Sequence, residues 1–228
     1  MQIVIAAGIV LLGYVLGSIP FGLLIVKLKT GKDIRTVESG RTGGTNAMRA
    51  AGFGAGLLTA IMDILKGAAA VWIARAVDPN NQLLHVLAPI ASIIGHNYSM
   101  FVVERDENGK FVRLRGGAGG APAVGGALGL WAPSLLTVLP LGALVFFTLG
   151  YASVTTISVA LFATLYFAWQ ALQGVTPWVN VIYGLAALVL LLWALRPNII
   201  KLFSGNERVV KYSLHGWFRA RGSQSATD

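Results

Sequence analysis

Residues 116–195 read GGAGGAPAVGGALGLWAPSLLTVLPLGALVFFTLGYASVTTISVALFATLYFAWQALQGVTPWVNVIYGLAALVLLLWAL and contain no Asp, Glu, Lys or Arg. Charged residues make up about 25% of an ordinary soluble domain, which does not leave 80 consecutive residues without one. A helix crosses the hydrocarbon core of a membrane with roughly 20 apolar residues, so this stretch has the length of four spans. Turn-forming residues divide it at 131–133, 150–153 and 174–177. We therefore predict membrane-spanning helices over residues 116–131, 133–150, 153–173 and 176–195.

Three more apolar runs precede this stretch, over residues 3–26, 51–77 and 83–103. They are apolar throughout and lack the alternation of barrel strands, so they also predict helices. Pro20, within the stretch Gly17–Gly22, should interrupt the first helix because proline removes a helix hydrogen bond. The pattern predicts an all-α integral membrane protein with a bundle of seven transmembrane helices. Residues 1–221 form a single membrane domain in this prediction, and residues 222–228 form a polar tail.

The composition agrees with a membrane protein, since 55% of the residues are hydrophobic, 12% are charged, and the mean hydropathy is +0.69. The 18 Lys and Arg residues outnumber the 9 Asp and Glu residues, which in a soluble chain would suggest nucleic acid binding. Here 16 of the 18 cations lie in the segments 27–49, 104–115 and 196–221, beside the predicted spans. The positive-inside rule then places the N-terminus outside and the C-terminus in the cytoplasm. We predict no nucleic acid partner.

The segment 39–49, SGRTGGTNAMR, is the first of several polar motifs next to the spans. Glycines permit close approach of the backbone to a ligand, successive N–H groups form an anion-binding nest, and arginine adds bidentate recognition of phosphate. The candidate anion-binding residues are Ser39, Gly40, Thr45, Asn46 and Arg49. The alternative is a flexible connector whose arginines only set the topology. The segment lacks the Gly-Lys-Ser/Thr ending of a nucleotide-binding P-loop.

Polar side chains also occur within or beside other spans. Lys66 shares a helix face with Asp63, and His96 lies in the motif Gly95–Ser99. Each has a structural alternative, the first as a mutually neutralising ion pair and the second as a hydrogen-bonded core histidine. The remaining candidates are Arg115, Gly116 and Gly117 in a glycine-rich loop, Ser153 after the fifth span, and Asn198 after the last.

These motifs gather at one membrane surface, whereas a transporter needs polar groups through the middle of the membrane. We therefore interpret the chain as an enzyme of the inner leaflet that acts on a phosphorylated substrate and a lipid. A small transporter is the alternative. The chain has no Cys, which excludes disulfides and cysteine nucleophiles, and its His, Asp and Glu residues lack metal-ligand spacing, so we predict no metal.

The order of the motifs resembles that of the bacterial acyl-phosphate:glycerol-3-phosphate acyltransferases of the PlsY type. The resemblance covers residues 10–207 and rests on Gly17–Gly22, Ser39–Arg49, Gly95–Ser99, Gly116–Gly120 and Asn198-Ile199. It implies a seven-helix enzyme of the bacterial inner membrane with a cytoplasmic active site. It also implies transfer of a fatty acyl group from acyl phosphate to the sn-1 hydroxyl of glycerol 3-phosphate. The product is lysophosphatidic acid, for phospholipid biosynthesis, and no metal or coenzyme is implied.

The resemblance also assigns roles by position. The family's first cytoplasmic motif matches Ser39, Gly40, Asn46 and Arg49, and its basic residue in the second span matches Lys66. Its other motifs match His96, Ser153 and Asn198. We expect His96 to orient a reactant and either backbone N–H groups or Asn198 to stabilise the oxyanion, which makes His96 and Asn198 the candidate catalytic residues. Arg49, Lys66 and Ser153 are expected to bind glycerol phosphate.

Several positions depart from the family pattern. Ala118 stands where the glycine loop has Lys, Gly150 where Arg precedes the Tyr-x-Ser, and Leu195 where His precedes the Asn by three residues. Arg41 stands where the first motif has Asn. These departures motivate a second hypothesis, a divergent or inactive paralogue that binds lipid or phosphate or uses another acceptor.

Overall fold

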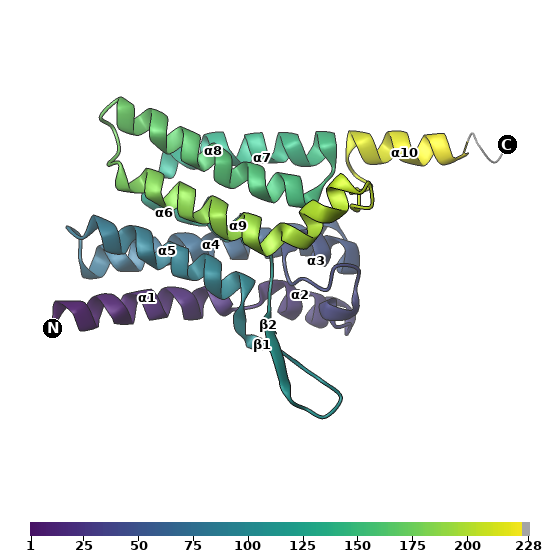
Figure 1. Ribbon diagram of the computed structural model, residues 1–228, viewed down its shortest axis with the longest axis horizontal. Coiled ribbons are helices and arrows are strands. Elements are labelled where there is room, and N and C mark those ends of the chain that lie inside the picture. The colour runs from purple at the N-terminus through teal and green to yellow at the C-terminus, as the bar shows by residue number, and fades with distance from the viewer. Residues whose placement is uncertain (225–228) are drawn as a thin grey trace.

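The apolar runs fold into helices that lie along a common direction in the computed structural model, which describes residues 1–224 (Figure 1). The α-helices are α1 (Gln2–Ser18), α2 (Phe21–Thr30), α3 (Gly44–Ala51), α4 (Phe53–Val77), α5 (Gln82–Asn97), α6 (Gly120–Leu130), α7 (Leu135–Leu149), α8 (Ala152–Leu172), α9 (Val179–Phe203) and α10 (Leu214–Gln224). Two short 3-10 helices are η1 (Ile34–Thr36) and η2 (Ala132–Ser134), and two strands are β1 (Ser99–Arg105) and β2 (Phe111–Arg115).

Five segments of the described chain are helical, long and apolar enough to cross a membrane. They are Gln2–Thr30, Phe53–Val77, Ala132–Leu149, Ala152–Leu172 and Val179–Phe203. The structure therefore agrees with the prediction of a helical integral membrane protein. Helix α5, with 16 residues, and helix α6, with 11 residues, are shorter than a full span. Two of the seven predicted spans, those of α5 and α6, are thus helices shorter than the thickness of a membrane requires.

The sequence-based prediction is wrong for the region between α5 and α6. Helix α5 ends at Asn97 instead of near residue 103, and β1 then pairs with β2 in an antiparallel hairpin. Figure 1 shows this hairpin pointing away from the bundle. A short apolar run rich in Val and Phe suits a strand as well as a helix, and periodicity cannot separate the two. Helix α6 begins at Gly120, so residues 116–119 form a loop at the site described below.

The predicted interruption of the first span is confirmed. Helix α1 ends at Ser18 and α2 begins at Phe21, because Pro20 has no N–H to continue the helix. In this break, the carbonyl oxygen of Ile19 accepts a hydrogen bond from Nζ of Lys66 at 2.9 Å. The interruption therefore lies where a buried cation of the bundle is bound.

Helices α1 and α5 pack backbone against backbone. A Cβ atom added to Gly17 would overlap the carbonyl oxygen of Ser92, and one added to Gly95 would overlap that of Tyr14. Small residues permit such close approach of helices in membranes, where packing contributes more to association than hydrophobic burial does. This contact fixes the end of α5, and with it His96, beside the α1–α2 break.

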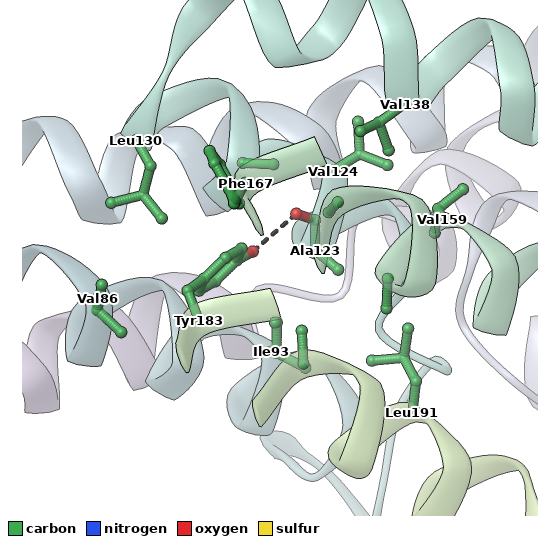
Figure 2. Close-up of a cluster of buried hydrophobic side chains, with 14 of the residues drawn as sticks. Val86, Ile93, Ala123, Val124, Leu130, Val138, Val159, Phe167, Tyr183 and Leu191 are labelled. Atoms are coloured by element: carbon green, nitrogen blue, oxygen red, sulfur yellow. Dashed lines mark hydrogen bonds between the residues drawn. The ribbon is translucent and has the colours of Figure 1, made fainter. Parts of the chain in front are cut away.

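The main apolar core lies between α5, α6, α8 and α9 (Figure 2). The hydroxyl of Tyr183 in α9 donates a hydrogen bond to the carbonyl oxygen of Ala123 in α6 at 2.7 Å, and the ring lies against Phe167. A buried hydroxyl without a partner costs about 1–3 kcal/mol, so this bond fixes where α9 sits on α6.

Helix α9 extends to Phe203, beyond the predicted end of the last span at residue 195. Pro197 lies inside this helix and has no N–H to donate to the carbonyl of Trp193, four residues earlier. That carbonyl accepts a hydrogen bond from the side chain of Arg196 at 3.1 Å instead. A β-bridge between Tyr151 and Val209 ties the following segment to the start of α8. Of the predicted polar tail, residues 222–224 belong to α10, and residues 225–228 lie outside the described residues.

Candidate active site

The candidate site lies at the end of the bundle that carries α2, α3 and the base of the hairpin (Figure 1). Backbone hydrogen bonds join its segments. The N–H of Thr42 donates to the carbonyl of Gly116 at 3.2 Å, and the N–H of Gly117 donates to the carbonyl of His96 at 2.8 Å. Three motifs far apart in the sequence, 39–49, 95–99 and 116–120, are therefore in contact.

Asn46 holds the first motif in place. Its buried amide nitrogen donates to the carbonyl oxygens of Ile34, Val37 and Arg41, at 2.9–3.2 Å. An Asn that bonds three carbonyls of one loop fixes the loop's path. The structure thus shows that Asn46 holds the loop in shape. Its contact with a ligand stays a prediction, and Oδ1 is the atom of its side chain that has no hydrogen-bond partner.

The other predicted residues of this motif frame the same loop. Gly40 is buried at φ +65°, which favours glycine, while Ser39 is exposed and Thr45 is half-buried. The N–H of Arg41 lies 3.4 Å from the Ser39 hydroxyl. Ser39 and Thr45 therefore present hydroxyl groups at the surface of the loop, where a ligand can reach them.

Arg41 is a site residue that its position in the sequence does not reveal. One terminal nitrogen of its guanidinium donates to the carbonyl of Gly117 at 2.8 Å. The other donates to the carbonyl of Ala194 at 2.7 Å and lies 3.3 Å from Oδ1 of Asn198. Burial lowers the pKa of Arg41, but arginine stays charged in proteins. The side chain thus brings a positive charge into the glycine-rich loop, at the position where Ala118 supplies none.

Arg49, in the last turn of α3, is the other half-buried arginine of this motif. Burial lowers the pKa of its guanidinium. Within residues 1–224 this guanidinium has no hydrogen-bond partner and no ion-pair partner. A half-buried, unpaired guanidinium has donors available for an anionic ligand, which fits the predicted phosphate contact.

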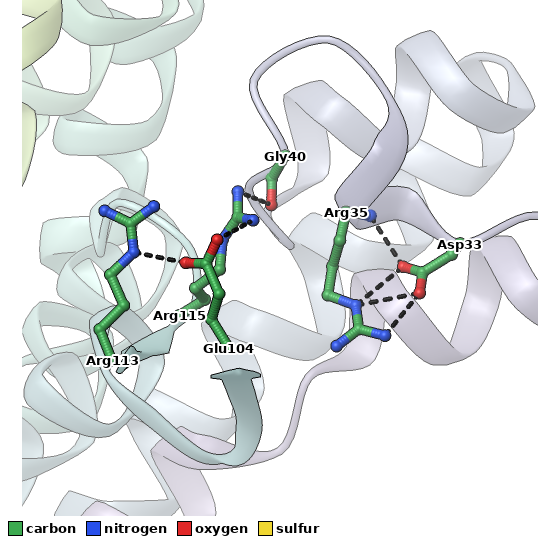
Figure 3. Close-up of polar contacts among 6 residues, drawn as sticks. All are labelled: Asp33, Arg35, Gly40, Glu104, Arg113 and Arg115. Carbon is green, nitrogen blue, oxygen red and sulfur yellow. Dashed lines mark hydrogen bonds and ion pairs between the residues drawn. The ribbon is translucent and has the colours of Figure 1, made fainter. Parts of the chain in front are cut away.

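Arg115 is held by protein groups at the base of the hairpin (Figure 3). It pairs with Glu104 at 3.5 Å and donates to the carbonyl of Gly40 at 3.3 Å. A hydrogen bond from Arg113 lowers the pKa of Glu104, which keeps this carboxylate ionised. On the far side of Gly40, Arg35 forms a local ion pair with Asp33 at 2.6 Å. Arg115 therefore joins the hairpin to the first motif, and its predicted contact with phosphate stays a prediction.

A buried cluster of Asp63, Lys66 and His96 lies beneath these loops. Nζ of Lys66 lies 2.7 Å from Oδ1 of Asp63 and 2.9 Å from Nδ1 of His96. The three side chains are 1%, 3% and 5% exposed. The predicted ion pair between Asp63 and Lys66 is present, and the ammonium is directed at protein groups. Protein groups thus engage the ammonium, and the predicted contact of Lys66 with glycerol phosphate stays a prediction.

The glycine-rich loop packs directly on the end of α5. A Cβ atom added to Gly117 would overlap Nε2 of His96, and one added to Gly119 would lie 2.9 Å from Oδ1 of Asn97. Gly119, at φ +87°, caps the N-terminus of α6. Asn97 is buried, and neither atom of its side-chain amide has a hydrogen-bond partner in the described chain. Asn97 is a candidate ligand residue that sequence reasoning missed, although its place beside His96 was a signal.

The start of α8 faces the same loop. A Cβ atom on Gly120 would lie 3.1 Å from the hydroxyl of Thr156, one turn beyond Ser153. The Ser153 hydroxyl is buried and has no partner in residues 1–224. Gly150 ends α7 at φ +73°, and a Cβ atom there would overlap Ser213. The positive φ at Gly150 and the lack of room for a Cβ atom thus favour glycine at this turn.

Asn198 lies in α9, where Pro197 interrupts the regular bonding. Its Oδ1 atom faces Arg41, and its Nδ2 atom donates to Glu207 at 3.0 and 3.2 Å. Leu195 is buried in the bundle. Asn198 is therefore oriented by a cation on one side and a carboxylate on the other, and Glu207 is a second residue that sequence reasoning did not single out. No group of three or more His, Cys, Asp or Glu in the described residues is arranged to hold a metal ion.

Comparison with known proteins identifies related sequences. The family model for glycerol-3-phosphate acyltransferase matches residues 7–205. A glycerol-3-phosphate acyltransferase of Rubrobacter xylanophilus is 36% identical over 200 residues, which is 88% of this chain and 92% of that protein. One of Thermus thermophilus is 36% identical over 198 residues, 87% of this chain and 92% of that protein.

Two solved structures have a similar fold. The crystal structure of PlsY, an integral membrane glycerol 3-phosphate acyltransferase, in its glycerol 3-phosphate form aligns with a TM-score of 0.75 and 30% identity. The alignment covers 90% of this chain and 95% of PlsY. Its lysophosphatidic acid form aligns with a TM-score of 0.73 and 28% identity, over 91% of this chain and 96% of that one.

Proposed function

Since the chain belongs to the glycerol-3-phosphate acyltransferase family of the PlsY type, we propose that it transfers a fatty acyl group from acyl phosphate to the sn-1 hydroxyl of glycerol 3-phosphate. The products are lysophosphatidic acid and inorganic phosphate. The observation that carries the proposal is the half-buried Arg41, whose guanidinium bonds the glycine-rich loop at Gly117, together with the half-buried Arg49 of the same first motif. Two guanidinium groups and glycine N–H groups suit two phosphates that must be brought together.

The reaction needs few groups that carry out proton chemistry. The sn-1 hydroxyl oxygen attacks the carbonyl carbon of the acyl phosphate, the bond between that carbon and the phosphate oxygen breaks, and phosphate leaves. The hydroxyl proton passes to the departing phosphate. Among the side chains that the structure describes, no Ser or Thr hydroxyl is hydrogen-bonded to a histidine ring, so we propose direct transfer without an acyl-enzyme. Positioning of the two reactants then supplies much of the rate increase.

Each candidate residue has a place in this scheme. Arg49, with the hydroxyls of Ser39, Thr45 and Ser153, binds the glycerol phosphate. Arg41 holds the phosphate of the donor beside Gly116 and Gly117, which leave room for the ligand to approach the backbone. Asn198 stabilises the negative charge that develops on the carbonyl oxygen. Asn46, Lys66 and Arg115 keep these groups in position through the contacts described above.

We propose that the protein lies in the bacterial inner membrane with its N-terminus outside and its C-terminus and active site on the cytoplasmic side. Counting α5 and α6 as spans gives seven, and an odd number puts the two termini on opposite sides. The support is the distribution of cations, of which 16 of 18 fall on one side of such a bundle. The fatty acyl donor then reaches the site from the membrane lipids, and the lysophosphatidic acid leaves the site into them.

The direct test uses purified protein in lipid vesicles with palmitoyl phosphate and glycerol 3-phosphate. We expect equal amounts of phosphate and lysophosphatidic acid, and a decrease of roughly 10- to 100-fold in kcat/KM for Arg49→Ala. A hydrogen bond to a charged group contributes about 1.5–3 kcal/mol, and the loss of this free energy lowers kcat/KM by roughly 10- to 100-fold.

Lys32→Ala is the matched control, because Lys32 is an exposed cation on the same side and its removal should leave the activity unchanged. Absence of both products from the folded protein, with acyl phosphate and with acyl carriers as donors, would support the divergent paralogue instead. In that case the variant Ala118→Lys/Leu195→His should create activity.

A further inference from the structure

The ammonium group of Lys66 has three protons, and three acceptors surround it. Oδ1 of Asp63 lies at 2.7 Å, the carbonyl oxygen of Ile19 at 2.9 Å, and Nδ1 of His96 at 2.9 Å. A lysine ammonium is only a donor, so the carbonyl oxygen of Ile19 and Nδ1 of His96 each accept one of its protons, while Asp63 is in ion-pair contact with it. The Asp63 carboxylate balances the charge, so the buried pair is neutral overall, which burial in a membrane protein requires.

This arrangement decides which nitrogen of His96 carries the ring proton. In neutral imidazole one nitrogen donates and the other accepts. Because Nδ1 accepts from Lys66, the proton must be on Nε2. A second positive charge on the imidazole is disfavoured, since Nδ1 would then have to donate toward the ammonium group at 2.9 Å.

Nε2 of His96 is directed at the candidate active site. It lies beneath Gly117, where a Cβ atom would overlap it, and 4.0 Å from where a Cβ atom of Gly43 would be. Nε2 has no hydrogen-bond partner among the described side chains. It also differs from the fully buried unpartnered atoms of the bundle, because it keeps some exposure to solvent. A side chain on either glycine would approach this nitrogen, so the two glycines keep the way to it open.

We infer that His96 is a fixed hydrogen-bond donor to an oxyanion bound beside Gly43 and Gly117, and that Asp63 and Lys66 are the positioning residues that hold it in this state. The ligand is an oxygen atom carrying negative charge, either of a substrate phosphate or of the carbonyl as it is attacked. A nitrogen that already bears a proton cannot remove one, so His96 does not act as the general base. The inference rests on the proposed function for the nature of the ligand, but not for the state of the ring.

The state of the ring is measured by NMR on protein labelled with ¹⁵N in its three histidines, of which His96→Gln identifies the relevant one. We expect an unprotonated Nδ1 and a protonated Nε2 for His96. The double variant Asp63→Asn/Lys66→Met removes both charges together, and it should convert His96 to a mixture of tautomers. His85 is the internal control, since its Nε2 bonds the carbonyl of Asp78 at 2.7 Å and should keep its signal in both proteins. A proton on Nδ1 of the unmodified protein overturns the inference.

The activity measurement separates a donor from a base. Glutamine carries an N–H group near the position of Nε2 and cannot act as a base, so His96→Gln should keep kcat within about 10-fold. His96→Ala should lower kcat by about 100- to 1,000-fold, as loss of one oxyanion donor does. Equal and complete loss in both folded variants would mean that His96 acts as a base.

These two measurements distinguish the inference from the proposed function. If the protein has no acyltransferase activity with any donor, the proposed function fails, and the NMR experiment still decides the tautomer. If the activity is present but His96 has its proton on Nδ1, the inference fails and the proposed function stands.

Discussion

At the scale of single residues, the site depends on Arg41, a cation that is far in the sequence from the residues it contacts. Arg41 precedes Gly117 by 76 residues and Asn198 by 157, and its guanidinium joins both. We propose that this cation takes the place of the Lys that the resemblance puts at Ala118 in the glycine-rich loop.

Replacing Arg41 tests this compensation. Arg41→Ala should lower kcat/KM by at least about 100-fold, because it removes a charge and leaves the carbonyls of Gly117 and Ala194 without their donor. Adding Ala118→Lys to this variant should restore part of the activity by supplying a cation from the loop itself. Unchanged kinetics of Arg41→Ala, measured with both substrates varied, would contradict the role given to Arg41.

At the scale of elements, close helix contacts position the chemistry. Helices α1 and α5 meet through Gly17 and Gly95, and this contact sets the break at Pro20 against His96. Helix α4 supplies Asp63 and Lys66 to the same point. A shift of α1 by the width of a methyl group would therefore change the bond between Lys66 and the carbonyl of Ile19.

Gly17→Ala is the variant that tests this contact. The added Cβ overlaps the carbonyl oxygen of Ser92, and we expect destabilisation of about 1–3 kcal/mol, as overpacking produces, together with reduced activity. Gly8→Ala is the control, because no atom lies within 4 Å of its added Cβ and alanine favours a helix by about 0.5–1 kcal/mol. Thermal unfolding in detergent measures both. A lower Tm for Gly8→Ala than for Gly17→Ala would contradict this account of the contact.

At the scale of the whole molecule, the polar motifs of the candidate site gather at one end of the bundle, and the opposite end carries none of them. The first motif, the hairpin, the start of α8 and the end of α9 all meet there (Figure 1). Such an arrangement suits an enzyme that takes one substrate from water and one from the membrane surface.

The proposed orientation has a simple test, because the chain contains no Cys. Single cysteines introduced as Gln2→Cys and Ser204→Cys are exposed at opposite ends of the bundle. In intact cells a membrane-impermeant thiol reagent should label the first and spare the second, and it should label both after lysis. Labelling of Ser204→Cys in intact cells would contradict the proposed topology and place this end of the bundle outside.

The sequence by itself determined the class of the protein. An uncharged stretch of 80 residues cannot form a soluble domain, and the motif order was specific enough to indicate the family. It also predicted the break at Pro20, because proline acts locally through its missing N–H. The pairing of Asp63 with Lys66 followed from their spacing on one helix face.

The tertiary structure decided what spacing cannot express. Residues 99–115 form a hairpin where the sequence predicts the end of a span and a loop, since a short apolar run fits either structure. The hydrogen bonds of Arg41 and the contact of Lys66 with His96 join segments 30 to 157 residues apart, and the side-chain amide of Asn97 has no partner in the described chain. Such contacts depend on how the helices pack, so only the folded chain reveals which cations are engaged by the protein and which remain available to a phosphate.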